Sequence, residues 1–202
     1  AGVHRADVRF EVDPGPRAAL SGLRFEGLAR VPADLVRNET DFALGVPYTP
    51  ALVQQIEKAL KGMRVFRWVA AQPATAVDRG GVEITVRVDE ADPQSVRVGV
   101  QLAIETQRWQ EQVAVSYTHT NLLGRLLRLD ASILAGWAEL PNPWAPIQHG
   151  PVVSLVPRFT WKGPLEKHLI WELTPRFDVD VQEGYQYISP ANRIGVSRWF
   201  AG

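Results

Sequence analysis

The sequence predicts an α+β domain of strand–helix–helix–strand–strand order, followed by antiparallel transmembrane β-barrel strands that form part of a barrel. Three observations predict this order. Helical and strand periodicities are mixed before residues 91–93, almost only a period of two follows, and the later strands are unusually long. These strands run about nine to fifteen residues, whereas strands of soluble sheets average about five or six and crossing a bilayer takes roughly 9–11.

The chain begins with two strand patterns. Residues 6–13 alternate apolar and polar side chains and are followed by Pro14-Gly15-Pro16, which predicts a strand that ends in a turn. Residues 18–28 form the next predicted strand, with Leu23 and Phe25 on one face.

Two helices follow. The first is predicted for residues 32–41. The second has a stronger start signal, because Thr49 is a suitable N-cap and Pro50 suits the first helical position. Its apolar residues recur at i, i+3 and i+4, which predicts an amphipathic helix lying on an apolar surface. They are Leu52, Val53, Ile56, Ala59, Leu60 and Met63.

Two more strands complete the domain, at residues 68–75 and 82–90, joined by a turn at 78–81. Pro73 lacks an N–H group, so the strand that contains it is expected at the edge of the sheet. Two helices would cover one face of this three-stranded sheet and give a compact α+β unit.

Beyond Pro93 six alternating runs place apolar residues on one face and charged residues on the other. Aromatic side chains lie toward strand ends on the apolar face, at Tyr117, Trp137 and Trp161, as in an interfacial girdle. The sixth run, residues 193–200, alternates poorly. A β-sandwich is the alternative interpretation, because its outer faces are also polar. Strand length favours the membrane barrel.

Composition excludes several classes of function. The chain has 202 residues, 22 basic and 22 acidic side chains, no Cys and four scattered His. Zero net charge argues against a nucleic-acid partner, and the lack of Cys excludes disulfides and thiolate chemistry. No metal motif, nucleophile elbow or phosphate loop occurs, so we predict no catalytic residue, cofactor or metal. Asp178 and Asp180 share a strand face with other charges and are expected to face water.

Several segments resemble a known family. Residues 23–27 (Leu-Arg-Phe-Glu-Gly), the two helices and residues 65–69 (Val-Phe-Arg-Trp-Val) resemble a POTRA (polypeptide-transport-associated) domain, and residues 12–17 resemble the close of a preceding one. Residues 119–125 are similar to the turn after an early barrel strand in the BamA/TamA family of outer-membrane assembly proteins. The residues of that turn are Asn121, Leu122, Leu123 and Gly124.

The resemblance implies three segments: the end of a POTRA unit at 1–16, a POTRA domain at 17–92 and about six barrel strands at 93–202. Family barrels have more strands, and residues 1–5 have no apolar signal region, so we expect the chain to be a piece of a longer protein.

The resemblance also implies a function. A TamA-like protein would insert or translocate unfolded outer-membrane or secreted clients from the bacterial periplasm, with a periplasm-spanning partner subunit and the lipid bilayer as further partners. The alternatives are a secretion pore for one dedicated partner and a soluble POTRA-like adaptor joined to a sandwich.

Two edges are the candidate sites for client binding, because an unfolded chain can add a strand to unpaired backbone groups. One is the POTRA edge, at Trp68, Val69, Ala70, Ala71 and Gln72. The other is the seam-forming first barrel strand, at Val96, Val98, Gly99, Val100, Leu102 and Ile104, where Gly99 is expected to weaken pairing.

Overall fold

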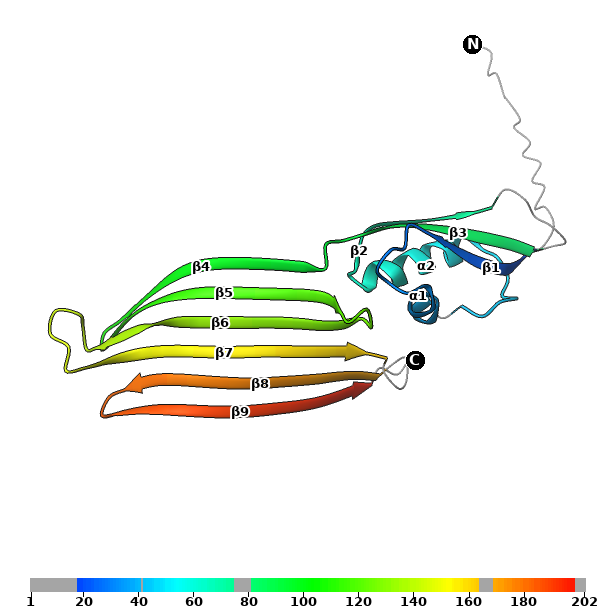
Figure 1. Cartoon of the computed structure of the whole chain (residues 1–202). Helices are drawn as coiled ribbons and strands as arrows, with labels where there is room; N and C mark the ends of the chain where they lie inside the picture. The colour runs from blue at the N-terminus through cyan, green and yellow to red at the C-terminus, as the bar shows by residue number, and fades with distance from the viewer. Residues whose placement is uncertain (1–17, 41, 75–80, 164–168, 199–202) are drawn as a thin grey trace, which may run out of the picture.

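The computed structural model describes residues 18–40, 42–74, 81–163 and 169–198 (Figure 1). The POTRA end predicted for residues 1–16 and most of the turn at 78–81 lie outside them. Two sheets follow one another along the chain: a three-stranded sheet with two helices and a six-stranded sheet without any. Among the described residues, no helix is both long enough and apolar enough to cross a membrane.

The first sheet has the predicted strand–helix–helix–strand–strand order. Its elements are β1 (Ala19–Glu26), α1 (Ala33–Thr40), α2 (Pro50–Gly62), β2 (Phe66–Pro73) and β3 (Gly81–Glu90). The strand order is β1-β3-β2, with β3 parallel to β1 and antiparallel to β2. The expected edge position of the strand that contains Pro73 is therefore confirmed. This strand starts at Phe66, two residues before the predicted start.

The second helix begins where the sequence predicts. Thr49 has an extended backbone, and its side-chain oxygen accepts a hydrogen bond from the N–H of Leu52 at 3.2 Å. Pro50 occupies the first turn, where its missing N–H costs nothing. Leu52, Ile56 and Leu60 are buried, so the predicted apolar face of α2 packs on the sheet.

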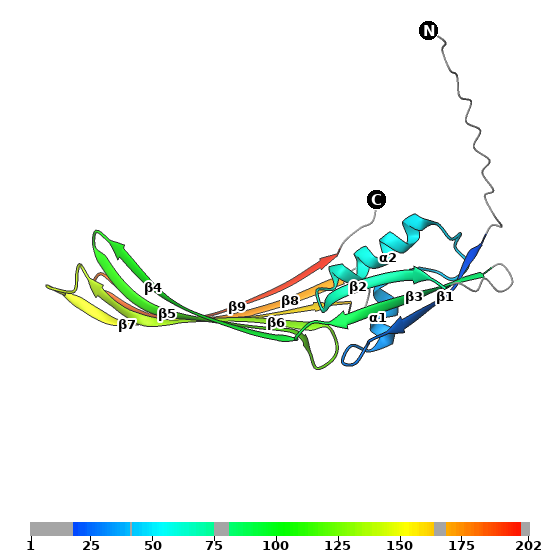
Figure 2. The same cartoon turned by 90° about the horizontal axis from the view of Figure 1, so that it is seen from above.

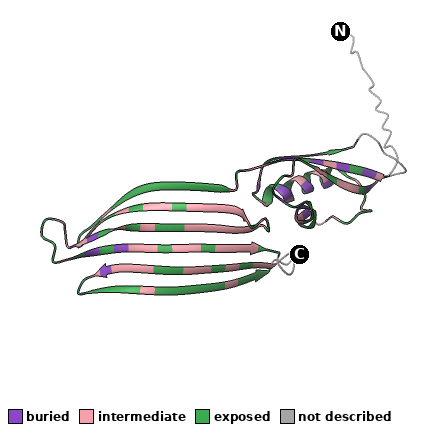
Figure 3. Ribbon diagram, viewed as in Figure 1, coloured by how far each residue is buried: buried purple, intermediate pink, exposed green. Residues whose placement is uncertain are grey.

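The buried core of the chain is concentrated in this first sheet. The helices α1 and α2 lie on one face of it, and the buried positions gather between helices and strands (Figure 3). The central strand β3 contributes most, because its alternating apolar residues all face the helices. The buried hydrophobic residues are Leu20, Val31, Val36, Leu52, Ile56, Leu60, Val65, Val69, Ala71, Val82, Ile84, Val86 and Val88.

The remaining six strands form one open antiparallel sheet in chain order, β4 to β9. The β-sandwich interpretation is therefore wrong: no second sheet packs on this one within the described residues. The strands are 12 to 15 residues long, and Figure 2 shows how strongly the sheet curves. They are β4 (Gln94–Glu105), β5 (Arg108–Leu122), β6 (Leu127–Leu140), β7 (Gln148–Lys162), β8 (Leu169–Gln182) and β9 (Tyr185–Arg198).

The last strand differs from the prediction. It begins at Tyr185, not at residue 193, and the predicted end at residue 200 lies outside the described residues. The apolar face of β9 includes Pro190 and Asn192, which lie opposite Phe177 and Pro175. These two residues interrupt the alternation, so the pattern reveals only the second half of the strand.

The strand register places the predicted apolar residues on one continuous face of the six-stranded sheet, here called the apolar face. One row crosses five strands through Val98, Val115, Ile133, Leu155 and Phe177. No helix covers this row, and on β4 the side chain of Val100 is 82% exposed. The opposite, polar face bears most of the charged side chains, whereas Glu111 and Glu139 share the apolar face with Trp109 and Trp137.

Candidate functional site at the strand edges and the sheet junction

Within the described ranges, each sheet has two outer strands with no neighbouring strand on one side. They are β1 and β2 in the first sheet and β4 and β9 in the second. Such rows of N–H and C=O groups are templates on which another chain can pair. All five residues of the predicted client-binding strand lie in β2, and all six residues of the predicted seam strand lie in β4.

The edge strand β2 alternates between core and solvent. Val69 is only 3% exposed and packs in the core beneath the helices, whereas Trp68 is 53% exposed on the opposite face. Packing against α2 therefore explains the apolar character of Val69 but not that of Trp68.

The outward backbone of β2 is already partly occupied. The N–H of Ala71 donates to Glu57 Oε1 of α2 at 3.0 Å, and Glu57 Oε2 also accepts from Lys61 Nζ at 3.1 Å. The hydrogen bond from Ala71 holds the pKa of Glu57 below its ordinary value, with burial opposing the effect and Lys61 adding to it. Two residues further, Pro73 has no N–H at all. A side chain from a helix and a proline therefore each take one outward donor away from this edge, and natural sheets protect their edges in both of these ways.

The edge strand β4 is regular. It pairs with β5 without interruption from Gln94 to Glu105, and Gly99 lies opposite Ala114 with no bulge. A Cβ atom added at Gly99 would meet nothing within 4 Å. Weakening at Gly99 therefore stays a prediction about pairing energy, because the geometry of the strand is unbroken.

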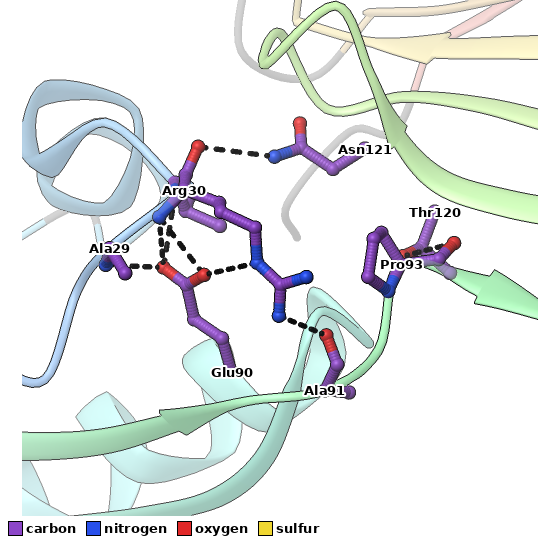
Figure 4. A network of polar contacts seen from close by, with 8 residues as sticks. Ala29, Arg30, Glu90, Ala91, Pro93, Thr120 and Asn121 are labelled. Atoms are coloured by element: carbon purple, nitrogen blue, oxygen red, sulfur yellow. Dashed lines mark hydrogen bonds and ion pairs between the residues drawn. The ribbon is translucent and has the colours of Figure 1, made fainter.

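The junction between the sheets is organised by one carboxylate (Figure 4). Glu90, at the end of β3, has a side chain only 6% exposed, and its Oε1 accepts from the N–H of Ala29 at 2.9 Å and of Val31 at 3.0 Å. Its Oε2 accepts from Arg30 Nε at 3.2 Å, while Arg30 Nη2 donates to the carbonyl of Ala91 at 3.2 Å. Burial raises the pKa of Glu90, but these hydrogen bonds outweigh it and leave that pKa lowered.

The predicted family turn lies against this junction. Asn121 Oδ1 accepts from the N–H of Leu126 at 2.9 Å, and Asn121 Nδ2 reaches the carbonyl of Arg30 at 3.5 Å. Leu123 and Gly124 have φ values of 59° and 66°, so the chain reverses tightly between β5 and β6. Leu126 also packs against the core of the first sheet. The turn therefore connects the two sheets as well as two strands.

A charged hollow of about 400 Å³ lies where the end of α2 meets the polar face of the second sheet. Acidic and basic groups both line it, so it carries no single sign of charge. Among the described residues, no three His, Cys, Asp or Glu side chains gather in a way that could hold a metal ion. The charged side chains that line the hollow are Glu39, Arg64, Arg128, Asp130, Arg158, Lys162 and Glu172.

The first sheet and its helices match a known family. Residues 19–91 match POTRA, described as a surface antigen variable number repeat. Residues 19–91 form a POTRA domain. This confirms the resemblance seen in residues 23–27, the two helices and residues 65–69.

Solved structures give more distant similarities. The crystal structure of BamA from Haemophilus ducreyi lacking POTRA domains 1–3 is 13% identical, with a TM-score of 0.47, over 91% of this chain and 43% of that one. CdiB from Acinetobacter baumannii is 9% identical, with a TM-score of 0.44, over 92% of this chain and 44% of that one. The chain thus spans less than half the length of these two proteins. Comparison with curated proteins gives no significant match.

Beyond the POTRA domain, one interaction crosses the concave polar face. Arg108 on β5 donates from Nη2 to Asp180 Oδ1 on β8 at 2.6 Å and from Nη1 to the carbonyl of Val181 at 2.8 Å. Val181 is fully buried there against Ala138 and Val152. Because β6 and β7 separate these strands, the sheet must curve for the groups to meet.

Sequence reasoning missed Glu90, Arg30 and Arg108. Glu90 ends an alternating strand like other acidic residues, and its partners at residues 29–31 lie about sixty positions away. No local pattern marks such a contact. Asp180, which was expected to face water, has a side chain only 18% exposed and accepts hydrogen bonds from Arg108 and Gln182.

Proposed function

We propose that this chain is part of a bacterial outer-membrane protein that inserts or translocates other proteins, with its POTRA domain in the periplasm and its six strands in the barrel wall. One observation carries the proposal. Only residues 91–93 separate a POTRA domain from a sheet of long strands with an uncovered apolar face. A water-soluble sheet rarely exposes such a large contiguous apolar surface.

The dimensions of the apolar face support a membrane location. Trp161 lies opposite Leu127 near the POTRA end of the sheet, and Trp137 lies on the same strand as Leu127 toward the far end. Leu127 and Trp137 are 137 − 127 = 10 positions apart on β6, about 33 Å at 3.3 Å per residue. At a strand tilt of roughly 40° this spans about 25 Å, the height of the apolar band in outer-membrane barrels.

The proposed mechanism is strand addition. An unfolded client has unpaired N–H and C=O groups, and a free strand edge satisfies them through the main chain, independently of the client's side chains. We place one such edge at β2, over residues 68–72, and another at β4, the seam strand. Because β4 presents apolar side chains as well as free backbone groups, a client strand that pairs with it also gains an apolar face in lipid.

The proposed partners follow from this mechanism: unfolded outer-membrane or secreted clients, the lipid bilayer, and a periplasm-spanning partner subunit in a TamA-like system. No nucleic acid is proposed, because the net charge is zero.

Depletion of the protein in its native host tests the proposal. With the protein expressed from its own gene under a repressible promoter, we expect many outer-membrane proteins to fall in abundance together, measured by quantitative proteomics of isolated membranes. Loss of a single secreted protein would support the dedicated exporter instead. Release of the protein into buffer without detergent would contradict both.

A further inference from the structure

We propose that the second half of β1, residues 23–26, is an additional strand-addition site of the POTRA domain. Its occupant is an extended client segment of alternating apolar and polar residues that pairs antiparallel with β1. The inference rests on the proposed function for the identity of the client, and on the geometry of β1 for the site.

The chain itself already pairs with the first half of this edge. The N–H of Leu20 donates to the carbonyl of Val46, and the N–H of Gly45 donates to the carbonyl of Leu20, both at 2.8 Å. The N–H of Tyr48 donates to the carbonyl of Ala18 at 2.8 Å, and the bridge beside it is antiparallel. The segment then turns away at Gly45, whose φ is 90°. The edge of β1 therefore accepts an antiparallel segment, and the described residues of the chain cover only half of it.

The uncovered half presents backbone groups of the same orientation. Side-chain face and lateral N–H direction alternate together along a strand. In β3, the residues whose side chains face the helices lie opposite three residues of β1. The register pairs Val82 with Leu20, Ile84 with Leu23 and Val86 with Phe25. Since the groups of Leu20 point outward to residues 45 and 46, those of Leu23 and Phe25 also point outward. Within the part of the chain that the structure describes, no hydrogen bond reaches them.

The side chains along this half are incompletely covered. Leu23, Phe25 and Leu28 pack against the POTRA core but are only partly buried. A shallow depression of about 530 Å³ lies beside them, and α1 flanks it through Ala33 and Arg37. An added strand whose apolar residues face the helices would complete the burial of these side chains, which provides a hydrophobic contribution in addition to the backbone hydrogen bonds.

The opposite edge offers fewer donors. In β2 the residues with core-facing side chains are Val69, Ala71 and Pro73. Glu57 occupies the N–H of Ala71 and Pro73 has none, so among these three described positions only Val69 keeps an open donor. In β1, Leu23 and Phe25 provide two. We therefore expect a client segment to prefer β1 over β2.

Disulfide capture tests this preference, because the chain contains no Cys. Arg24→Cys on β1 and Gln72→Cys on β2 are matched, exposed, solvent-face positions. Each whole-chain variant is oxidised with a ten-residue peptide of alternating Val and Thr that carries one central Cys, and the mixed disulfide is quantified by mass spectrometry. One additional hydrogen bond of about 1 kcal/mol predicts about fivefold more capture at position 24 than at position 72.

Two backbone variants provide an independent measurement. Leu23→Pro and Val69→Pro each remove one outward N–H and one apolar core side chain, and leave the donors that face β3 in place. Leu23→Pro is expected to lower peptide binding more than Val69→Pro does. If either variant unfolds, shown by circular dichroism, the capture comparison still decides, since Arg24 and Gln72 have exposed side chains.

The outcomes separate this inference from the proposed function. Equal or greater capture at position 72, or no capture at either position, overturns the β1 site. If client levels in the outer membrane still fall on depletion, the proposed function stands without a β1 site. If depletion changes no client while capture at position 24 persists, the edge binds strands but the proposed function is wrong.

Discussion

The POTRA domain and the six-stranded sheet contain strands with the same period, yet their apolar residues end in opposite surroundings. In β3, Val82, Ile84, Val86 and Val88 are all buried beneath the helices. In β4, the equally regular residues 96–104 are mostly exposed. The described part of the POTRA domain has thirteen buried hydrophobic residues in its core, and the six-stranded sheet has a buried cluster of only four.

Under the proposed function, this difference means that the two regions depend on different solvents. The POTRA domain removes its apolar surface from water within itself, which is the dominant favourable contribution to folding. The six-stranded sheet keeps its apolar side chains outward, where only lipid or another apolar surface can receive them. Four experiments test this difference.

The largest expected effect is on the free energy of unfolding of the POTRA domain. Ile84→Ala should lower the free energy of unfolding of the POTRA domain by about 2–5 kcal/mol, because it leaves a cavity at a fully buried position. Val100→Ala, at an exposed position of β4, should change stability in aqueous buffer by less than about 0.5 kcal/mol. Urea titration monitored by hydrogen exchange measures both. Equal losses for the two variants would contradict the distinction.

A charged residue introduced on the apolar face of the six-stranded sheet tests whether that face contacts lipid. Val115→Lys should oppose insertion into bilayers by about 2–4 kcal/mol, because an ammonium group near the bilayer centre loses its hydration. Ser116→Lys, one residue away and on the polar face, is the matched control and should insert normally. Heat-modifiable migration of the protein in outer-membrane extracts reports insertion. Similar behaviour of both variants would mean that the sheet does not face lipid.

Acid should loosen the POTRA domain through Glu90. The pKa of Glu90 is lowered in the folded state. The stabilisation that Glu90 gives the folded state is therefore complete above the ordinary glutamate pKa of about 4.3. It is lost as the pH falls through the lower pKa of the folded state, since the unfolded chain then binds more protons. Glu90→Gln should cost about 1–3 kcal/mol at neutral pH and remove this part of the acid sensitivity. Unfolding measured from pH 7 to pH 3 checks it, and an unchanged pH profile in the variant would argue against the role of Glu90.

The smallest expected effect concerns the connection between the two regions. Asn121→Ala removes the bond to the N–H of Leu126 and the longer contact with the carbonyl of Arg30, so we expect a loss of about 0.5–1.5 kcal/mol. Hydrogen exchange should rise at residues 29–31 as well as at the turn. A rise confined to the turn would show that Asn121 serves only its own hairpin.

Much of the fold followed from local signals. Thr49 and Pro50 marked the start of α2, Pro73 placed its strand at an edge, and strict alternation located five of the six long strands. The start of β9 was missed, because Pro190 and Asn192 interrupt the pattern of its apolar face.

The candidate sites could be predicted from the sequence only in part. The sequence indicated which residues lie on edge strands, because alternation and proline position are properties of short segments. It did not reveal which edge is open. The carboxylate of Glu57 reaches the N–H of Ala71 from a helix, and residues 45–48 cover only half of β1.

The elements, their period and the faces of each strand are therefore readable from the sequence, since they depend on neighbours within a few residues. The folded structure is needed to see which apolar faces are covered, which backbone donors stay open, and how Glu90 connects β3 to residues 29–31 across about sixty positions. These are contacts between distant parts of the chain, and their energies depend on packing and desolvation that no local pattern encodes.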